Sequence, residues 1–260
     1  MSPASAPSRP TKSLRSRTKP LAGRGSEPLR AAALHDVHGN LPAFEAVLAE
    51  IDRDPVDLLV FGGDIAAGPF PRETIELAMG LDPVRFVRGN ADRAMVEIFD
   101  GESDPGTGLA DAWAVGRLDQ VHRDFLAGFE PTVRAAGALF CHATPHDDEP
   151  IFTRASSDER VRALLGDIDD RLVVCGHTHM QFDRTVEGIR VVNAGSVGLS
   201  YGTTDACWAV VQDGDVELRR TPYDREAVRA SAFARADEFL EEHSEEEVVA
   251  FFEAQAAAAG

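Results

Sequence analysis

The fold is constrained most by a series of short apolar runs, each of which ends in Gly, Asp or His or is directly followed by Gly. These runs cover residues 30–36, 57–62, 84–88, 132–142 and 171–175. Segments whose apolar residues have a helical spacing lie between them, at about 41–53, 71–80, 92–128 and 157–165. Strands that alternate with helices predict a layered α/β fold, in which residues 132–142 form either a hairpin or one long strand.

The second half of the chain has more β character. Turn signals such as Glu187-Gly188 and Asp213-Gly214 separate short strands, predicted at about 181–186, 189–193, 206–212 and 215–221. Two helices are expected after them, over about 224–242 and 244–258. Ser244 and Glu247 have the spacing of a capping box at the start of the second helix.

Composition divides the chain into three parts. Residues 1–28 are rich in Ser, Pro, Arg and Lys and are expected to form a disordered basic tail. This tail could bind polyanions or could simply extend the chain. Residues 29–222 are expected to form one domain, and residues 223–260 to form C-terminal helices that pack on it or mediate homo-oligomerisation.

Charge and composition argue against several classes of protein. The formal net charge of -18 disfavours a long nucleic acid or an anionic membrane as partner. No run of about 18 apolar residues is present, and the first residues lack the apolar core of a secretory signal, so a cytoplasmic location is expected. Three cysteines are too few for a disulfide scaffold. Without a Walker-type loop containing Lys, NTP-driven phosphoryl transfer is not expected.

Residue types that bind metals follow five of the predicted strands. In chain order they are Asp36-Val37-His38, Gly63-Asp64, Gly89-Asn90, His142 and Gly176-His177-Thr178-His179. The carboxyl ends of strands in a layered α/β fold converge on one rim, where ligands usually bind. Each residue alone could be a helix cap, a turn residue or a core residue, but packing does not explain the ordered set.

This order of motifs resembles the calcineurin-like metallophosphoesterases, over about residues 30–221. The family pattern is D-x-H, G-D, G-N, a lone H and G-H-x-H. By its compact length, the chain is most similar to the small bacterial and archaeal phosphodiesterases of this family. The resemblance implies a four-layer αββα sandwich of two mixed β-sheets flanked by helices, and a metal-dependent phosphoric ester hydrolase.

The resemblance also implies two divalent metal ions, Mn²⁺ foremost, with Fe, Zn²⁺, Ni²⁺ or Co²⁺ as alternatives. The first would be held by Asp36, His38, Asp64 and His179, and the second by Asp64, Asn90, His142 and His177. Two such cations about 3.5–4 Å apart would neutralise phosphate oxygens and activate a bridging hydroxide for in-line attack. Asp64, Asn90 and His142 are therefore expected to act in catalysis as well as in binding.

The residue after Gly89-Asn90 departs from the pattern. Many family members have a His there that is thought to aid the leaving group, whereas this chain has Ala91. His146 is the nearest candidate for the missing proton donor, with an exposed loop histidine as the alternative. Asp92 is expected to orient a ligand or cap the following helix.

Four further residues lie beside these motifs or shortly after them in the sequence. Arg88, Arg93 and Arg154 could clamp a substrate phosphate or form surface ion pairs. His35, the strand neighbour of Asp36, is expected to point to the opposite face and so to lie outside the site.

The leading hypothesis is a phosphodiesterase that acts on a small or nucleotide-like phosphoester. The alternative is a phosphomonoesterase, acting on nucleotides or phosphoproteins. A lower-ranked alternative is a non-catalytic interaction scaffold on the same fold. Ala91 favours diesters, because within the family that the chain resembles this form of the motif goes with small phosphodiesterases more than with protein phosphatases.

Overall fold

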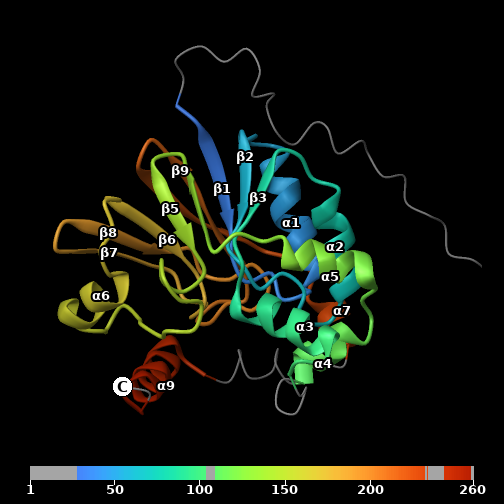
Figure 1. Ribbon diagram of the computed structural model, residues 1–260. Helices are drawn as coiled ribbons and strands as arrows, with labels where there is room; N and C mark the ends of the chain where they lie inside the picture. Colours follow the sequence, from blue (N-terminus) through green and yellow to red (C-terminus); the bar gives the residue numbers. More distant parts are fainter. Residues whose placement is uncertain (1–27, 104–108, 232, 234–242, 259–260) are drawn as a thin grey trace, which may run out of the picture.

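Two five-stranded sheets lie face to face in the computed structural model, which describes residues 28–103, 109–231, 233 and 243–258 (Figure 1). The first sheet has the order β10 (Asp215–Thr221), β9 (Ala206–Gln212), β1 (Arg30–Leu34), β2 (Leu58–Phe61) and β3 (Val84–Phe86). The second has the order β4 (Thr132–Ala135), β5 (Ala138–Cys141), β6 (Leu172–Cys175), β8 (Ile189–Asn193) and β7 (Phe182–Val186).

Helices cover the outer faces of both sheets. Those described are α1 (Leu41–Ile51), α2 (Pro71–Met79), α3 (Asn90–Asp100), α4 (Leu109–Val115), α5 (Gln120–Ala127), α6 (Asp158–Leu165), α7 (Glu226–Arg229) and α9 (Glu245–Ala258). Figure 1 shows α1, α2 and α5 beside the first sheet and α6 on the outer side of the second. Each sheet has parallel and antiparallel neighbours, so the predicted four-layer sandwich of two mixed sheets is confirmed.

The apolar run in β1 is continuous because both faces of this strand are covered. Ala31 and Ala33 face the second sheet and pack in the core between the sheets with Phe140. Leu34 faces the other way and packs with Phe44 of α1. The strand that leads to the first predicted ligand is therefore held on both sides.

The strands that precede the predicted ligands run in parallel within each sheet. β1, β2 and β3 are parallel neighbours in the first sheet, and β5, β6 and β8 are parallel neighbours in the second. Their carboxyl ends consequently reach the same edge of the sandwich. Residues 132–142 form a hairpin, because Ala136 and Gly137 at its tip have φ values of 50° and 78°, as a tight primed turn requires.

The C-terminal region differs in part from expectation. The helix predicted over 224–242 is only the short α7 in the described residues, and the Ser231 hydroxyl ends it by bonding the Val228 carbonyl. The remainder of that prediction, residues 232 and 234–242, lies outside the described residues, as does the predicted tail before Pro28.

The last helix, α9, begins where its capping box predicts. The Ser244 amide donates to Glu247 Oε2 at 2.8 Å, and the Glu247 amide donates to Ser244 Oγ at 3.3 Å. Val248 and Val249 pack against Met180, the residue after His179. Homo-oligomerisation through this helix stays a prediction. No helix among the described residues has both the length and the apolar character needed to cross a membrane.

His35 is a fully buried core residue directly before the first predicted ligand. Its Nε2 lies 3.2 Å from the Cys141 carbonyl oxygen of the other sheet. The ring packs so closely on Gly62 that a Cβ there would lie 1.8 Å from His35 Cδ2. Burial lowers the pKa of His35 to about 4, although the nearby Asp36 carboxylate opposes this shift.

We predict that His35 makes the fold sensitive to acid. The unfolded chain binds a proton on His35 near pH 6.5, whereas the folded chain does not until about pH 4. Its contribution is therefore fully present above pH 6.5 and lost as the pH falls, by up to about 3 kcal/mol. Urea unfolding of the wild type and His35→Gln between pH 4 and 7 measures this loss.

The other histidines are common to both proteins, so the difference between the two pH profiles isolates His35. The variant should lose less unfolding free energy on acidification than the wild type. Parallel profiles would contradict the prediction.

Candidate metal centre

The residues that follow the five strands meet at one edge of the sandwich. Asp36 and His38 follow β1, Asp64 follows β2, and Asn90 begins α3 just after β3. His142 follows β5, and a single turn after β6 supplies the last two members of the set, His177 and His179. The structure thus brings together all seven residues that the sequence pattern predicts as ligands.

One group of ligand atoms forms around Asp36. Its Oδ1 lies 3.3 Å from His179 Nε2 and 3.8 Å from His38 Nε2. The two imidazole nitrogens are themselves 3.1 Å apart. His38 Nε2 is also 3.8 Å from Asp64 Oδ2, so Asp64 borders this group. Asp36, His38 and His179 offer atoms close enough to hold one metal ion.

A second group forms around His142. Its Nε2 lies 2.9 Å from Asn90 Oδ1, 3.1 Å from His177 Nδ1 and 3.5 Å from Asp64 Oδ2. Because Asp64 Oδ2 approaches both His38 and His142, this carboxylate stands between the two groups. Asp36 borders this group too, since Asp36, Asp64 and His142 together offer atoms close enough to hold a metal ion.

In each of the four histidines of the centre, the ring nitrogen that faces away from the other ligands lies within hydrogen-bond distance of a backbone carbonyl oxygen. The four pairs are His38 with Ala67, His142 with Gly62, His177 with Glu149 and His179 with Leu199, at 2.9 to 3.1 Å. A carbonyl can only accept, so the outward nitrogen carries the proton and the inward nitrogen has a free lone pair. This second layer of contacts is the usual way in which a protein orients metal-binding imidazoles.

The charges of the centre suit a cation. Asp36 Oδ1 is buried and has no hydrogen-bond partner among the described residues. Burial lowers the pKa of His38 and lowers that of His177 to about 4, so both rings are neutral at pH 7. Burial also acts against a proton on His142, but Asp64 and Asp36 outweigh it and raise that pKa. A metal ion bound to this ring would compete with a proton for the inward nitrogen.

Backbone strain is concentrated at the same residues. Five of the seven have positive φ, namely Asp36, His38, Asp64, His177 and His179 with φ between 48° and 66°. Such a conformation costs about 1–3 kcal/mol at a residue other than glycine and persists only where the surroundings enforce it. It turns the chain sharply after each strand and aims successive side chains at one point.

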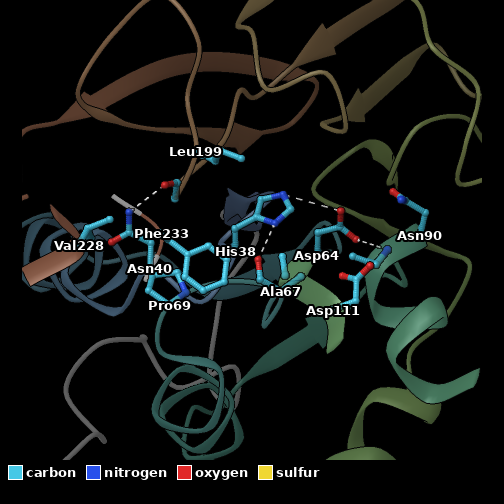
Figure 2. A pocket seen from close by; sticks show the side chains of 14 residues that line it. His38, Asn40, Asp64, Ala67, Pro69, Asn90, Asp111, Leu199, Val228 and Phe233 are labelled. Carbon is cyan, nitrogen blue, oxygen red and sulfur yellow. Dashed lines mark hydrogen bonds and ion pairs between the residues drawn. The ribbon is translucent and has the colours of Figure 1, made fainter. Parts of the chain in front are cut away.

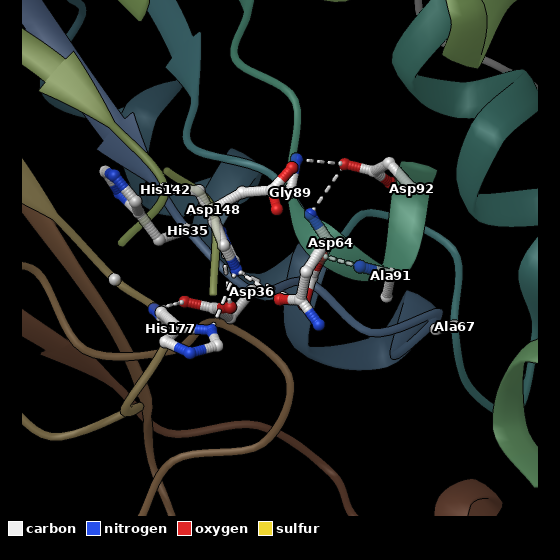
Figure 3. Close-up of polar contacts among 12 residues, drawn as sticks. His35, Asp36, Asp64, Ala67, Gly89, Ala91, Asp92, His142, Asp148 and His177 are labelled. Carbon is white, nitrogen blue, oxygen red and sulfur yellow. Dashed lines mark hydrogen bonds and ion pairs between the residues drawn. The ribbon is translucent and has the colours of Figure 1, made fainter. Parts of the chain in front are cut away.

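Asp92 holds the two turns that carry Asp64 and Asn90. It accepts hydrogen bonds from the amides of Gly89, Asp64 and Ile65 at 2.7 to 3.0 Å, two of which Figure 3 shows. Gly89 must be glycine here, since a Cβ would lie 2.1 Å from Asp64 Oδ1. Asp92 therefore positions the turn, and its carboxylate is occupied by these amides.

The structure does not bring His146 to the centre. Thr144 and Asp147 close a tight turn through the Asp147 carbonyl and the Thr144 hydroxyl, and His146 points outward from it. Its ring is exposed and packs against Gly166 at the end of α6. This corrects the expectation that His146 could replace the proton donor missing at Ala91.

The three candidate arginines are all ion-paired. Arg93 contacts Asp148 at 2.9 Å, and Arg88 contacts the same carboxylate at 3.4 Å. Arg154 pairs with Glu245 of α9. The three arginines therefore form ion pairs, as the alternative interpretation of the sequence predicted.

Sequence reasoning missed the segment after β8 that completes the centre. The Ser196 hydroxyl donates to the Asp36 carbonyl at 2.7 Å, and the side-chain Nδ2 of Asn193 donates to the Gly176 carbonyl at 2.6 Å. The Leu199 carbonyl orients His179. The signal in the sequence is the small and polar run Asn193-Ala-Gly-Ser196 directly after a strand, which has the same form as the ligand-bearing turns.

We predict that Asp92→Asn weakens metal binding although Asp92 is not placed as a ligand. The amide keeps the volume but loses an acceptor oxygen, so the turn carrying Asp64 and Asn90 loosens. Loss of such a supporting contact typically costs about 10–100-fold in metal affinity. Calorimetric titration of metal-stripped protein with Mn²⁺ measures it.

The matched control is Asp100→Asn, the same change at the other end of α3, where the carboxylate pairs with Arg123. The control should bind Mn²⁺ as the wild type does. Equal affinity of all three proteins would show that the Asp92 contacts do not support the centre.

Three comparisons with known proteins agree with this geometry. The family model of the calcineurin-like phosphoesterase superfamily domain matches residues 29–214. Uncharacterized protein MJ0912 of Methanocaldococcus jannaschii is 26% identical over 220 residues, which cover 74% of this chain and 87% of the relative.

Solved structures give the same result. A metallophosphoesterase from Sphaerobacter thermophilus is 25% identical with a TM-score of 0.64, and the match covers 86% of this chain and 98% of that one. Hypothetical protein PH1004 from Pyrococcus horikoshii OT3 shares the fold, at 20% identity and a TM-score of 0.66 over 86% of this chain and 97% of its own. Since the family model spans well over half of the chain, this protein belongs to the calcineurin-like phosphoesterase superfamily and is a metal-dependent phosphoester hydrolase.

Proposed function

We propose that the protein is a dinuclear, Mn²⁺-dependent phosphodiesterase that hydrolyses a small or nucleotide-like phosphoester. The observation that carries this proposal is the pair of ligand groups that meet at Asp64, within 3.8 Å of His38 on one side and 3.5 Å of His142 on the other. A carboxylate with two oxygens suits a bridging position. The mixed imidazole, carboxylate and amide donors suit Mn²⁺ and its neighbours better than Ca²⁺.

The residues of the chain would divide the work as follows. Asp36, His38 and His179 would hold one ion, while Asn90, His142 and His177 would hold the other. Two ions in such a site supply Lewis-acid activation of the phosphate and of a water molecule. Asp92 holds the turns that carry Asp64 and Asn90, and the carbonyls behind the histidines place the proton of each neutral ring on its outward nitrogen.

Two observations support a diester over a monoester. Ala91 stands where many family members have a His, and within the family this form of the motif goes with small phosphodiesterases more than with protein phosphatases. The arginines that flank the Gly89-Asn90 motif already have carboxylate partners, since Arg88 and Arg93 share Asp148 and Arg93 also pairs with Glu97 and Glu149. A monoester carries about two negative charges near pH 7 and a diester carries one, so the diester needs less help from cationic side chains.

We predict that Mn²⁺-loaded protein hydrolyses bis(4-nitrophenyl) phosphate faster than 4-nitrophenyl phosphate. Asp64→Ala and His177→Ala should each lower kcat/KM for the diester by about 10³-fold or more, because each removes a group that holds the activating ions. Release of 4-nitrophenolate measures both effects, and thermal unfolding checks that the variants are folded.

Asp215→Ala provides the control, since it removes an exposed carboxylate at the far end of β10. It should behave as the wild type. Faster turnover of the monoester would identify a phosphomonoesterase instead. No turnover of either ester with any of Mn²⁺, Zn²⁺, Ni²⁺ or Co²⁺ would overturn the proposal.

A further inference from the structure

A cavity of about 320 Å³ opens directly beside the metal centre. His38, Asp64 and Asn90 form its wall on the side of the centre. The rest of its lining is largely apolar and includes Ala67, Pro69, Leu199, Val228 and Phe233. Figure 2 shows Pro69, Val228 and Phe233 across the cavity from Asp64 and Asn90. Its volume lies at the lower end of the range of about 300–1,000 Å³ for ligand pockets, which suits one ring-sized group.

The wall of the cavity and the metal centre are built from the same backbone. The Ala67 carbonyl accepts from His38 Nδ1, and the Leu199 carbonyl accepts from His179 Nδ1. The side chains of Ala67 and Leu199 line the cavity. A group bound to the phosphorus at the centre would therefore enter a cavity whose position relative to the metal ligands is held by two hydrogen bonds.

Asp111 of α4 places one carboxylate in this lining. Figure 2 shows it on the same side as Asp64 and Asn90. It belongs to neither group of candidate metal ligands, and it has no hydrogen bond or ion pair with the described residues. Among the described residues that line the cavity, none is Lys or Arg. The charge of Asp111 is thus available to whatever occupies the cavity.

The electrostatics of this carboxylate disfavour an anion. Partial burial, and then the negative charge of Asp64, raise the pKa of Asp111 to about 6. It remains mostly ionised at pH 8, and the described residues of the lining give it no cationic partner. A second phosphate or a carboxylate in the cavity would lose hydration and meet a like charge, whereas a hydroxyl or amine would gain an acceptor.

We propose that this cavity binds one alcohol group of the substrate as an uncharged ring that bears a hydrogen-bond donor, such as a nucleoside, and that Asp111 is the residue that rejects anionic groups there. This inference rests on the proposed function, because it assumes that the phosphoryl group sits at the metal centre. It names the class of substrate: a diester whose second alcohol carries no phosphate.

The test uses two esters that differ only in charge and donor. They are 4-nitrophenyl 3-(hydroxymethyl)phenyl phosphate and 4-nitrophenyl 3-carboxyphenyl phosphate, assayed with the Mn²⁺-loaded full chain at pH 8. The wild type should favour the hydroxymethyl ester by about tenfold or more in kcat/KM. Asp111→Asn should lower this ratio about tenfold, and Asp215→Asn, which removes a charge at the far end of β10, should leave it unchanged.

A second variant tests the same inference independently if Asp111→Asn does not fold. Ala110→Lys adds a cation to the same lining and should also lower the ratio. The dissociation constants of 3-(hydroxymethyl)phenylphosphonate and 3-carboxyphenylphosphonate, measured by calorimetry on the Mn²⁺-loaded protein, should show the same ratios without any turnover.

These readouts separate the two proposals. Absence of turnover together with the expected ratio of dissociation constants would overturn the phosphodiesterase and support the cavity. Normal turnover with a ratio that neither Asp111→Asn nor Ala110→Lys changes would overturn the role of Asp111 and leave the phosphodiesterase standing. A wild type that favours the carboxylated ester would overturn the inference outright.

Discussion

Four hydrogen bonds from imidazole nitrogens to backbone carbonyls are the contacts on which the centre depends. Each one removes the choice between the two ring nitrogens and leaves a lone pair facing inward. The carbonyls belong to Gly62, Ala67, Glu149 and Leu199, which lie in the turns after the strands or in the loops between them. The geometry of the centre is therefore a property of the backbone, and the rigid sandwich determines where the turns lie.

Holding these groups together is costly in the absence of a cation. Asp36 Oδ1 is buried and accepts no hydrogen bond from the part of the chain that the structure describes, and five of the seven converging residues have positive φ. Two well-packed cores offset this cost, one between the sheets and one under α1. A bound cation would relieve the electrostatic part, which links the stability of this edge of the fold to metal binding.

The same turns also shape what reaches the centre. Ala67 and Leu199 orient histidines through their carbonyls and line the adjacent cavity with their side chains. Ala91 is a small residue whose amide donates to Asp64 Oδ1 at 2.9 Å. The turn after β3 therefore supports the centre through its backbone.

The sequence by itself determined the layered fold and the seven converging residues, because apolar runs between glycine-bearing turns specify strands, and parallel strands end at one edge. Only the tertiary structure decided the positions of His146 and Asp111. The Thr144–Asp147 turn leaves His146 exposed, and it depends on three hydrogen bonds that no spacing reveals. Asp111 reaches the cavity because α4, which carries it, packs against α3, and α3 begins at Asn90 of the centre; this helix packing leaves no local pattern in the sequence.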